Sequence, residues 1–349
     1  MIERITVQDK VDLTKNLSVM LQSGITLNEA LHSLGETARS RAMKNVLLKM
    51  NTNIEAGNRL SSALRKERNS FDGIFVGLVE AGERSGKLQD NLKFLSAWLE
   101  RNNDLKREIS AATLYPKLVL SAAAILGAGL SVFILPRLVP LFEQLNTDLP
   151  LITKILLAVS LFLQKHWIAL FVGIVLCIGG FLLLERIRSV RKTLQEAYSF
   201  LPVIGGLLRD YELALITQLF HTLLSSGLSM NESISIVCGA VSDVRYQDSF
   251  VRIRTDVESG TTLSNSMKKY PRLYPLNVIA IIKTGEKSGT LSDVFLYLSE
   301  YYSKEVSEKA KKLPTVLEPI LLICIALVVG FIALSIITPI YKLTGSLNR

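Results

Sequence analysis

The 349-residue sequence has few residues of the types that support catalysis or covalent cross-linking. Its three cysteines, Cys177, Cys238 and Cys324, form no CxxC pair, so the sequence predicts neither a disulfide framework nor a thiolate metal site. The three histidines are widely separated, and no Ser/His/Asp or Cys/His set occurs in both halves of the chain. A Walker motif is also missing, so the chain is not its own nucleotide-driven motor. We therefore expect no enzyme activity, no cofactor and no metal.

Strand signals are missing as well. No run alternates apolar and polar residues with period two, and no Asn-Gly or Asp-Gly turn separates two apolar stretches. Apolar residues recur instead at helical spacing. Leu13, Leu17, Met20 and Leu21 fall on one helix face, and Gly24 is suited to end that helix. The sequence therefore predicts an all-α protein.

Charged residues are absent from three long apolar segments, Leu118–Leu135, Trp167–Leu184 and Ile320–Thr338. Each has 18 or 19 residues, close to the ~20 needed to cross a hydrocarbon core of ~30 Å. We therefore predict three transmembrane helices. A further apolar stretch, 151–163, is interrupted by Lys154 and is predicted to be an amphipathic helix on the membrane surface. Ion-coupled transporters normally need ionisable groups within their spans, so a transporter is disfavoured.

The distribution of lysine and arginine predicts the orientation. Residues 1–117 and 185–317 hold 35 of the 40 basic residues, whereas loop 137–166 holds three. The positive-inside rule places both large segments and the N-terminus in the cytoplasm, and the C-terminus outside, in a bacterial inner membrane. The first residues lack an apolar core, so no cleavable signal peptide is expected. Topology and contact with the lipid bilayer explain the net charge of +9, and we expect no direct nucleic-acid partner.

An internal repeat relates the two halves at a constant offset of 203 residues. Leu21–Leu31 matches Leu224–Ile234, and Ile54–Ser61 matches Val257–Ser264, both without a gap. We therefore expect two parallel copies of a bundle of about six helices, with the middle span returning the chain. The predicted segments are a first cytoplasmic bundle 1–117, a transmembrane helix 118–136, an external loop with an amphipathic helix 137–166, a transmembrane helix 167–184, a second cytoplasmic bundle 185–317, a transmembrane helix 318–339 and an external tail 340–349.

The most distinctive repeated motif is Gly-Glu-x-Ser-Gly, which occurs once in each copy. A phosphate-binding loop usually needs a preceding strand and a basic residue at fixed spacing, and both are missing here. We expect a helix to stop at the first glycine, a tight turn at the second, and the glutamate to bond free amides of the following helix. We interpret the motif as bundle architecture that supports docking. Its residues are Gly82, Glu83, Ser85, Gly86, Gly285, Glu286, Ser288 and Gly289.

Other paired positions predict helix starts and contacts between spans. The sequences Thr26-x-x-Glu29 and Ser229-x-x-Glu232 are capping boxes. Small residues four apart allow close approach of membrane helices, and prolines precede two spans at equivalent positions. We predict span packing at Ala123, Gly127, Ala326 and Gly330, and span entry at Pro116 and Pro319.

These features together resemble the type II secretion F / type IV pilus assembly platform family over nearly the whole chain. The matching features are the two helical modules, the apolar-Gly-Glu-x-Ser-Gly-x-Leu motif and the Tyr-Pro or Glu-Pro before a span. The segments Ser-Gly-Ile-Thr-Leu-Asn-Glu-Ala-Leu and Tyr270-Pro-x-x-Tyr-Pro275 also look like family positions. Two features depart from the family. The sequence starts almost at the first predicted helix, so we expect it to lack the upstream extension of many relatives. Asp72 stands where Pro275 stands in the second copy, which we expect only to loosen a turn.

The resemblance implies a non-catalytic inner-membrane platform. Such a protein couples a cytoplasmic hexameric assembly ATPase to insertion or extraction of pilin or pseudopilin subunits, together with other inner-membrane assembly proteins. A homo-oligomer is expected. One alternative is the platform of a DNA-uptake (competence) pseudopilus, and a less favoured one is a small-molecule transporter. These machines share the fold, so the sequence does not choose between pilus, secretion and competence.

Overall fold

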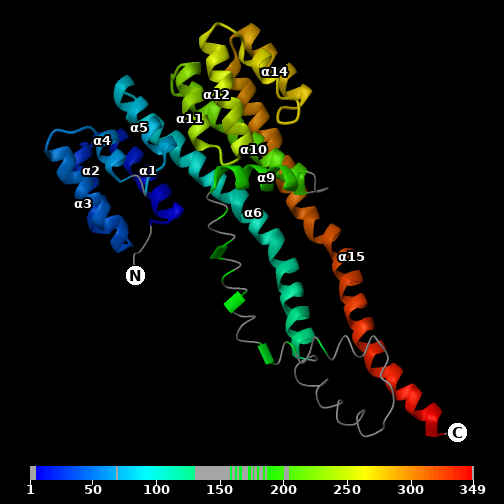
Figure 1. Ribbon diagram of the computed structural model, residues 1–349. Coiled ribbons are helices and arrows are strands. Elements are labelled where there is room, and N and C mark those ends of the chain that lie inside the picture. The colour runs from blue at the N-terminus through cyan, green and yellow to red at the C-terminus, as the bar shows by residue number, and fades with distance from the viewer. Residues whose placement is uncertain are drawn as a thin grey trace. The chain divides into compact units, whose positions relative to one another are not determined.

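The computed structural model describes residues 5–67, 70–129, 187–199 and 204–347, with isolated positions between 158 and 184. Every regular element in these ranges is a helix, and no strand occurs among them. The ribbon in Figure 1 shows these helices. The predicted all-α fold is therefore confirmed.

Six helices form each of two bundles within the described ranges, as the repeat predicted. The first bundle consists of α1 (Val7–Gln22), α2 (Leu27–Thr37), α3 (Arg41–Glu55), α4 (Leu60–Lys66), α5 (Gly73–Ser85) and α6 (Leu88–Gly129). The second bundle consists of α10 (Ile204–Ser225), α11 (Met230–Ala240), α12 (Val244–Glu258), α13 (Leu263–Met267), α14 (Leu276–Ser288) and α15 (Leu291–Leu347). A further helix, α9 (Arg188–Ser199), precedes the second bundle and was not predicted.

The helix ends repeat as well as the helices. Gly24 and Gly227, which follow α1 and α10, both have φ of 83°, a left-handed conformation that glycine adopts without strain. Both predicted capping boxes are present, because the Thr26 hydroxyl accepts from the Glu29 amide and the Ser229 hydroxyl accepts from the Glu232 amide. The same local chemistry therefore starts and stops equivalent helices in both bundles.

Asp72 replaces a proline without leaving the start of α5 uncapped. Its Oδ1 accepts a hydrogen bond of 2.9 Å from the Phe75 amide, whereas Pro275, at the start of α14, makes no side-chain cap bond. The expectation that Asp72 loosens a turn was therefore wrong, since a side-chain cap takes over from the fixed backbone of proline.

The core of the second bundle is rich in aromatic rings. Phe220 stacks on Phe295 with ring centroids 4.8 Å apart. Tyr246 and Tyr274 are buried edge to face, and the Tyr246 hydroxyl donates to the Leu273 carbonyl. Burial raises the pKa of both tyrosines, so their hydroxyls remain protonated and act as hydrogen-bonding groups inside the core.

The chain divides into two compact units, residues 1–108 with 192–309, and residues 109–191 with 310–349. Among the described residues, two helices are long and apolar enough to cross a membrane, α6 over Leu88–Gly127 and α15 over Leu291–Phe331. Both helices continue through the predicted span-entry prolines, Pro116 and Pro319.

Two membrane predictions concern residues outside the described ranges. The predicted middle span, 167–184, and the predicted amphipathic helix, 151–163, both lie outside the described residues apart from isolated positions. The middle span and the exact segment boundaries therefore stay predictions.

Candidate functional site

The Gly-Glu-x-Ser-Gly motif forms the end of α5 in the first bundle and the end of α14 in the second. Gly86 and Gly289 follow these helices with φ of 70° and 73°, and their amides donate to the carbonyls of Gly82 and Gly285. The prediction that the helix stops at the first glycine of the motif was wrong. The helix continues to the serine, because an i to i−4 hydrogen bond still forms there and the second glycine supplies the left-handed end.

The first glycine of each motif permits a close approach of two helices. A β-carbon on Gly82 would lie 2.9 Å from the Leu88 Cα, at the start of α6. A β-carbon on Gly285 would lie 2.8 Å from Val294 Cγ2, on α15. Both distances are shorter than a carbon–carbon contact allows. At Gly82 the nearest atom belongs to the backbone, so a larger residue would require α6 to move, whereas at Gly285 the Val294 side chain would have to shift.

The glutamate of each motif caps a short helix from outside that helix. Glu83 accepts hydrogen bonds from the Leu60 amide (2.6 Å), the Ser61 amide (3.3 Å) and the Ser61 hydroxyl (2.5 Å), at the start of α4. Glu286 accepts from the amide of Ser264 (3.2 Å) and from its hydroxyl, at the start of α13. We call these two arrangements the Glu83 cap and the Glu286 cap.

The predicted partner of the glutamate was therefore wrong. The carboxylate bonds an earlier helix and not the one that follows it in sequence. The physical reason lies at the starts of α4 and α13, where Arg59 and Thr262 occupy the N-cap positions and neither makes a side-chain cap bond. The first amides of both helices lack a local acceptor, and a carboxylate at a helix N-terminus also interacts favourably with the helix dipole.

The serine of each motif bonds back onto its own helix. Ser85 donates to the Ala81 carbonyl over 2.8 Å, and Ser288 donates to the Thr284 carbonyl over 3.0 Å. The glutamate and the serine of each motif thus form these bonds within their own bundle. In the part of the chain that the structure describes, no group of three or more His, Cys, Asp or Glu side chains could hold a metal ion.

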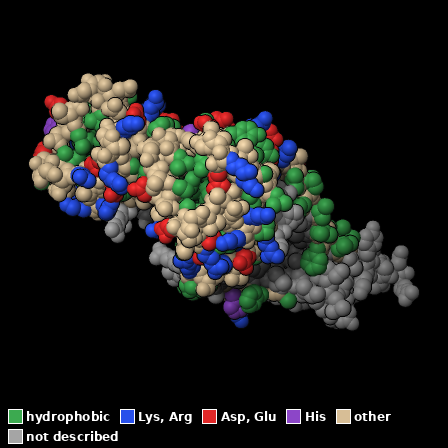
Figure 2. Space-filling model, turned by 90° about the horizontal axis from the view of Figure 1, so that it is seen from above, with side chains coloured by type: hydrophobic (Ala, Val, Ile, Leu, Met, Phe, Trp, Pro, Cys, Tyr) green, Lys and Arg blue, Asp and Glu red, His purple; other side chains and the backbone are tan. Residues whose placement is uncertain are grey.

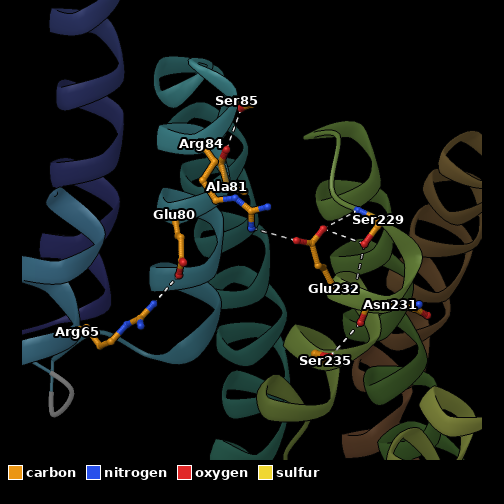
Figure 3. Close-up of polar contacts among 9 residues, drawn as sticks. All are labelled: Arg65, Glu80, Ala81, Arg84, Ser85, Ser229, Asn231, Glu232 and Ser235. Atoms are coloured by element: carbon orange, nitrogen blue, oxygen red, sulfur yellow. Dashed lines mark hydrogen bonds and ion pairs between the residues drawn. The ribbon is translucent and has the colours of Figure 1, made fainter. Parts of the chain in front are cut away.

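The variable residue of the first motif connects the two bundles. Figure 3 shows Arg84 on α5 pointing toward Glu232 on α11, and its Nη1 donates to Glu232 Oε1 over 3.1 Å. α5 also packs against α11 where a β-carbon on Gly77 would lie 2.9 Å from Ile236 Cδ1. The sequence did not predict this contact. The sequence did contain a signal for it. In each copy the variable position of the motif is basic (Arg84 and Lys287), and a capping box supplies a glutamate (Glu29 and Glu232).

Glu232 has two roles, because it also caps its own helix. Its Oε2 accepts from the Ser229 hydroxyl (2.8 Å) and the Ser229 amide (3.1 Å). These bonds, more than the ion pair with Arg84, hold the pKa of Glu232 below its ordinary value of 4.5. Because the folded-state pKa is lowered, this stabilisation is present above pH 4.5 and is lost as the pH falls through the folded-state pKa.

We expect Ser229→Ala to raise the pKa of Glu232 more than Arg84→Ala does. The serine supplies the strongest bond to the charged carboxylate, whereas the arginine contact is largely solvent-exposed. NMR titration of the Glu232 carboxyl carbon in the full chain measures both shifts. A larger shift with Arg84→Ala would show that the contact between bundles dominates.

The predicted span residues lie on the two long helices. Ala123 and Gly127 are on α6, and Ala326 and Gly330 are on α15. Among the described residues, nothing lies within 4 Å of a β-carbon built on Gly127 or Gly330. Their role in packing between spans stays a prediction.

A known protein family matches this chain twice, once in each copy of the internal repeat. The family model of the type II secretion system (T2SS), protein F, matches residues 13–136 and again 216–339. Both the starts and the ends of these two matches are 203 residues apart, which is the offset of the repeat. Each match reaches from the first helix of a bundle into its candidate span.

Similar curated proteins match over almost the full length. The type IV pilus assembly protein PilC of Thermus thermophilus is 29% identical over 98% of this chain and 84% of its own length. PilC of Pseudomonas aeruginosa is 28% identical over 95% of this chain and 88% of its own length. The type II secretion system protein F of Xanthomonas campestris is 28% identical over 97% of this chain and 83% of its own length.

Proposed function

Since the chain belongs to the type II secretion system protein F family, we propose that it is the inner-membrane platform of a type IV pilus or type II secretion machine. The observation that carries the proposal is the double family match, which includes both bundles and both candidate spans. The relatives' names, pilus assembly protein and secretion system protein, support the same class of machine. In this proposal both bundles and the N-terminus are cytoplasmic, residues 167–184 return the chain, and the C-terminus is external.

The bundles would dock a cytoplasmic hexameric assembly ATPase. Figure 2 shows basic and acidic side chains interspersed over the left and central parts of the view, which suits a polar protein partner. The sequence has no Walker motif, so the partner ATPase supplies the free energy in this proposal. The chain itself transmits force and performs no chemistry.

The two candidate spans would contact pilin or pseudopilin subunits within the bilayer. Leu118 and Ile125 on α6 and Leu327 on α15 are 60%, 71% and 69% exposed. Exposed apolar side chains at this density suit lipid or another apolar helix. Other inner-membrane assembly proteins would dock around the same platform.

Deletion of the gene in its host tests the function. We expect loss of surface filaments and twitching, or loss of secreted proteins, with the assembly ATPase still present at its normal level and activity restored by the wild-type gene. Loss of transformation alone would favour the competence pseudopilus. Unchanged filaments, secretion and transformation, with solute uptake by proteoliposomes of the purified chain, would contradict the proposal in favour of a transporter.

A further inference from the structure

The two bundles pack against each other through α5 of the first bundle and α11 of the second, and this packed pair uses only half of the equivalent surfaces that the repeat creates. The repeat equivalents of these helices are α14, in the second bundle, and α2, in the first. Among the described helices, α14 and α2 do not form a comparable packed pair. Each chain therefore carries one further copy of each contact surface.

The surface on α14 reproduces the basic side of the contact. Lys287 is the equivalent of Arg84, and Ala280 is the equivalent of Gly77. Lys283, Lys287 and Leu276 are exposed, and Leu276 is 69% exposed. In the described part of the chain, neither lysine makes an ion pair. α14 thus presents two cations beside an uncovered apolar side chain.

The surface on α2 is equivalent to the acidic surface of α11, and its glutamate makes the same cap bonds. Glu29 is the equivalent of Glu232, and its Oε2 accepts from the Thr26 hydroxyl (2.9 Å) and the Thr26 amide (3.2 Å). In Glu232, Oε2 likewise accepts the cap bond from Ser229, while the second oxygen, Oε1, accepts a hydrogen bond from Arg84. On Glu29 this second oxygen accepts no hydrogen bond from the described residues. Glu36, also exposed, adds a further negative charge to α2.

We propose that α14 of one copy of this chain packs against α2 of a second copy, with Lys287 bonded to Glu29 as Arg84 is bonded to Glu232. The charges are complementary, since α14 presents lysines where α2 presents glutamates. At the centre of the contact, Ala280 and Ser33 replace Gly77 and Ile236. This pair buries less apolar surface, so the contact between copies is weaker and more reversible than the contact within a copy.

The proposed contact is head-to-tail, because it joins different surfaces of the two copies. Such a contact leaves one α14 and one α2 surface open in every assembly until a ring closes. With both repeats oriented in parallel across the membrane, repetition keeps every bundle on the same side. The α5–α11 contact within each copy then alternates with the α14–α2 contact between copies, and together they build a ring of bundles. The number of copies in the ring depends on the angle by which each contact rotates one copy relative to the next. Neither contact depends on which secretion or pilus machine the chain serves.

Co-purification of two differently tagged full-length copies from one membrane tests this contact. Glu29→Lys and Lys287→Glu each place like charges opposite one another, and we expect each variant to reduce recovery of the second tag by about tenfold. Co-expression of the Glu29→Lys chain with the Lys287→Glu chain should restore recovery, since every contact between unlike chains then joins opposite charges. Mass photometry of the restored complex in nanodiscs should show two or more copies, whereas a monomer would contradict the contact.

Controls separate this contact from folding and from net charge. Glu29→Gln keeps a cap acceptor while removing the charge, and should lower recovery less than Glu29→Lys. Lys44→Glu and Glu300→Lys make the same charge changes on exposed positions of α3 and α15, and should leave recovery unchanged. Wild-type recovery for either single variant on α2 or α14, or failure of the co-expressed pair to restore recovery, would overturn the proposal.

Discussion

Replacing Glu83 by alanine is expected to lower the free energy of unfolding of the first bundle by about 2–4 kcal/mol, the range for losing charge-assisted hydrogen bonds and leaving their donors unpaired. Glu83 is bonded by two backbone amides and one hydroxyl at the start of α4. The N-cap residue of α4, Arg59, makes no side-chain cap bond that could take over. Glu83→Gln should cost less, because the amide oxygen still accepts hydrogen bonds without the charge.

Denaturant unfolding of the full chain in micelles, with hydrogen exchange at the Leu60 and Ser61 amides, measures this effect. The matched control is Glu80→Ala, three residues earlier on α5, which removes an exposed ion pair with Arg65. That variant should cost at most about 1 kcal/mol and leave the exchange of the α4 amides unchanged. Equal costs for Glu80→Ala and Glu83→Ala would contradict the Glu83 cap. Glu286→Ala should repeat the result at α13.

Replacing Gly82 by alanine is expected to destabilise the first bundle by about 1–3 kcal/mol, as overpacking of a close contact does. The new methyl group would lie 2.9 Å from the Leu88 Cα and 3.1 Å from Asn91 Cβ. The first of these is a backbone atom, so relief requires α6 to move and not merely a side chain to rotate. The movement would also strain the hydrogen bond from the Asn91 side chain to the Leu78 carbonyl.

The matched control for Gly82→Ala is the same substitution at Gly239 on α11. No atom lies within 4 Å of a β-carbon there, so alanine should stabilise the helix by about 0.5–1 kcal/mol through its higher helix propensity. The two substitutions are chemically identical and are expected to have opposite signs in thermal or denaturant unfolding. Destabilisation of similar size at both positions would mean that close packing is not the role of Gly82.

The fold followed from patterns that act over short distances. The capping boxes and the left-handed glycines depend only on residues within one or two turns. The repeat then carried each of these assignments from one copy to the other, and together they located the helices of both bundles. The longer extent of α5 was missed because Gly82 was taken as a helix stop. Glycine within a helix is tolerated when a neighbouring helix needs the space, and sequence alone does not show that neighbour.

The partner of Glu83 could not be inferred from nearest neighbours in the sequence. The nearest later helix starts at Leu88, yet the fold brings the carboxylate to amides 22 and 23 residues earlier. A usable clue was Arg59, a residue type that is a poor N-cap, just before a predicted helix. The contact between the bundles could not be predicted from the sequence for a different reason. Both copies carry a basic residue at the variable position of the motif and a glutamate in a capping box, so the sequence allows several pairings. Only the three-dimensional structure shows that Arg84 pairs with Glu232.

Site-specific photocrosslinking in living cells tests the platform claim most directly. A photoreactive residue would replace Lys44 or Lys304 on the exposed bundle surfaces, or Leu126 or Leu327 on the exposed apolar faces of α6 and α15. Variants that still support filament assembly or secretion are then irradiated, and the cross-linked products are identified by mass spectrometry. We expect the bundle positions to capture the cytoplasmic assembly ATPase and the span positions to capture a pilin-like subunit. Capture of neither protein at any of these positions, in cells whose machine is working, would contradict the platform claim.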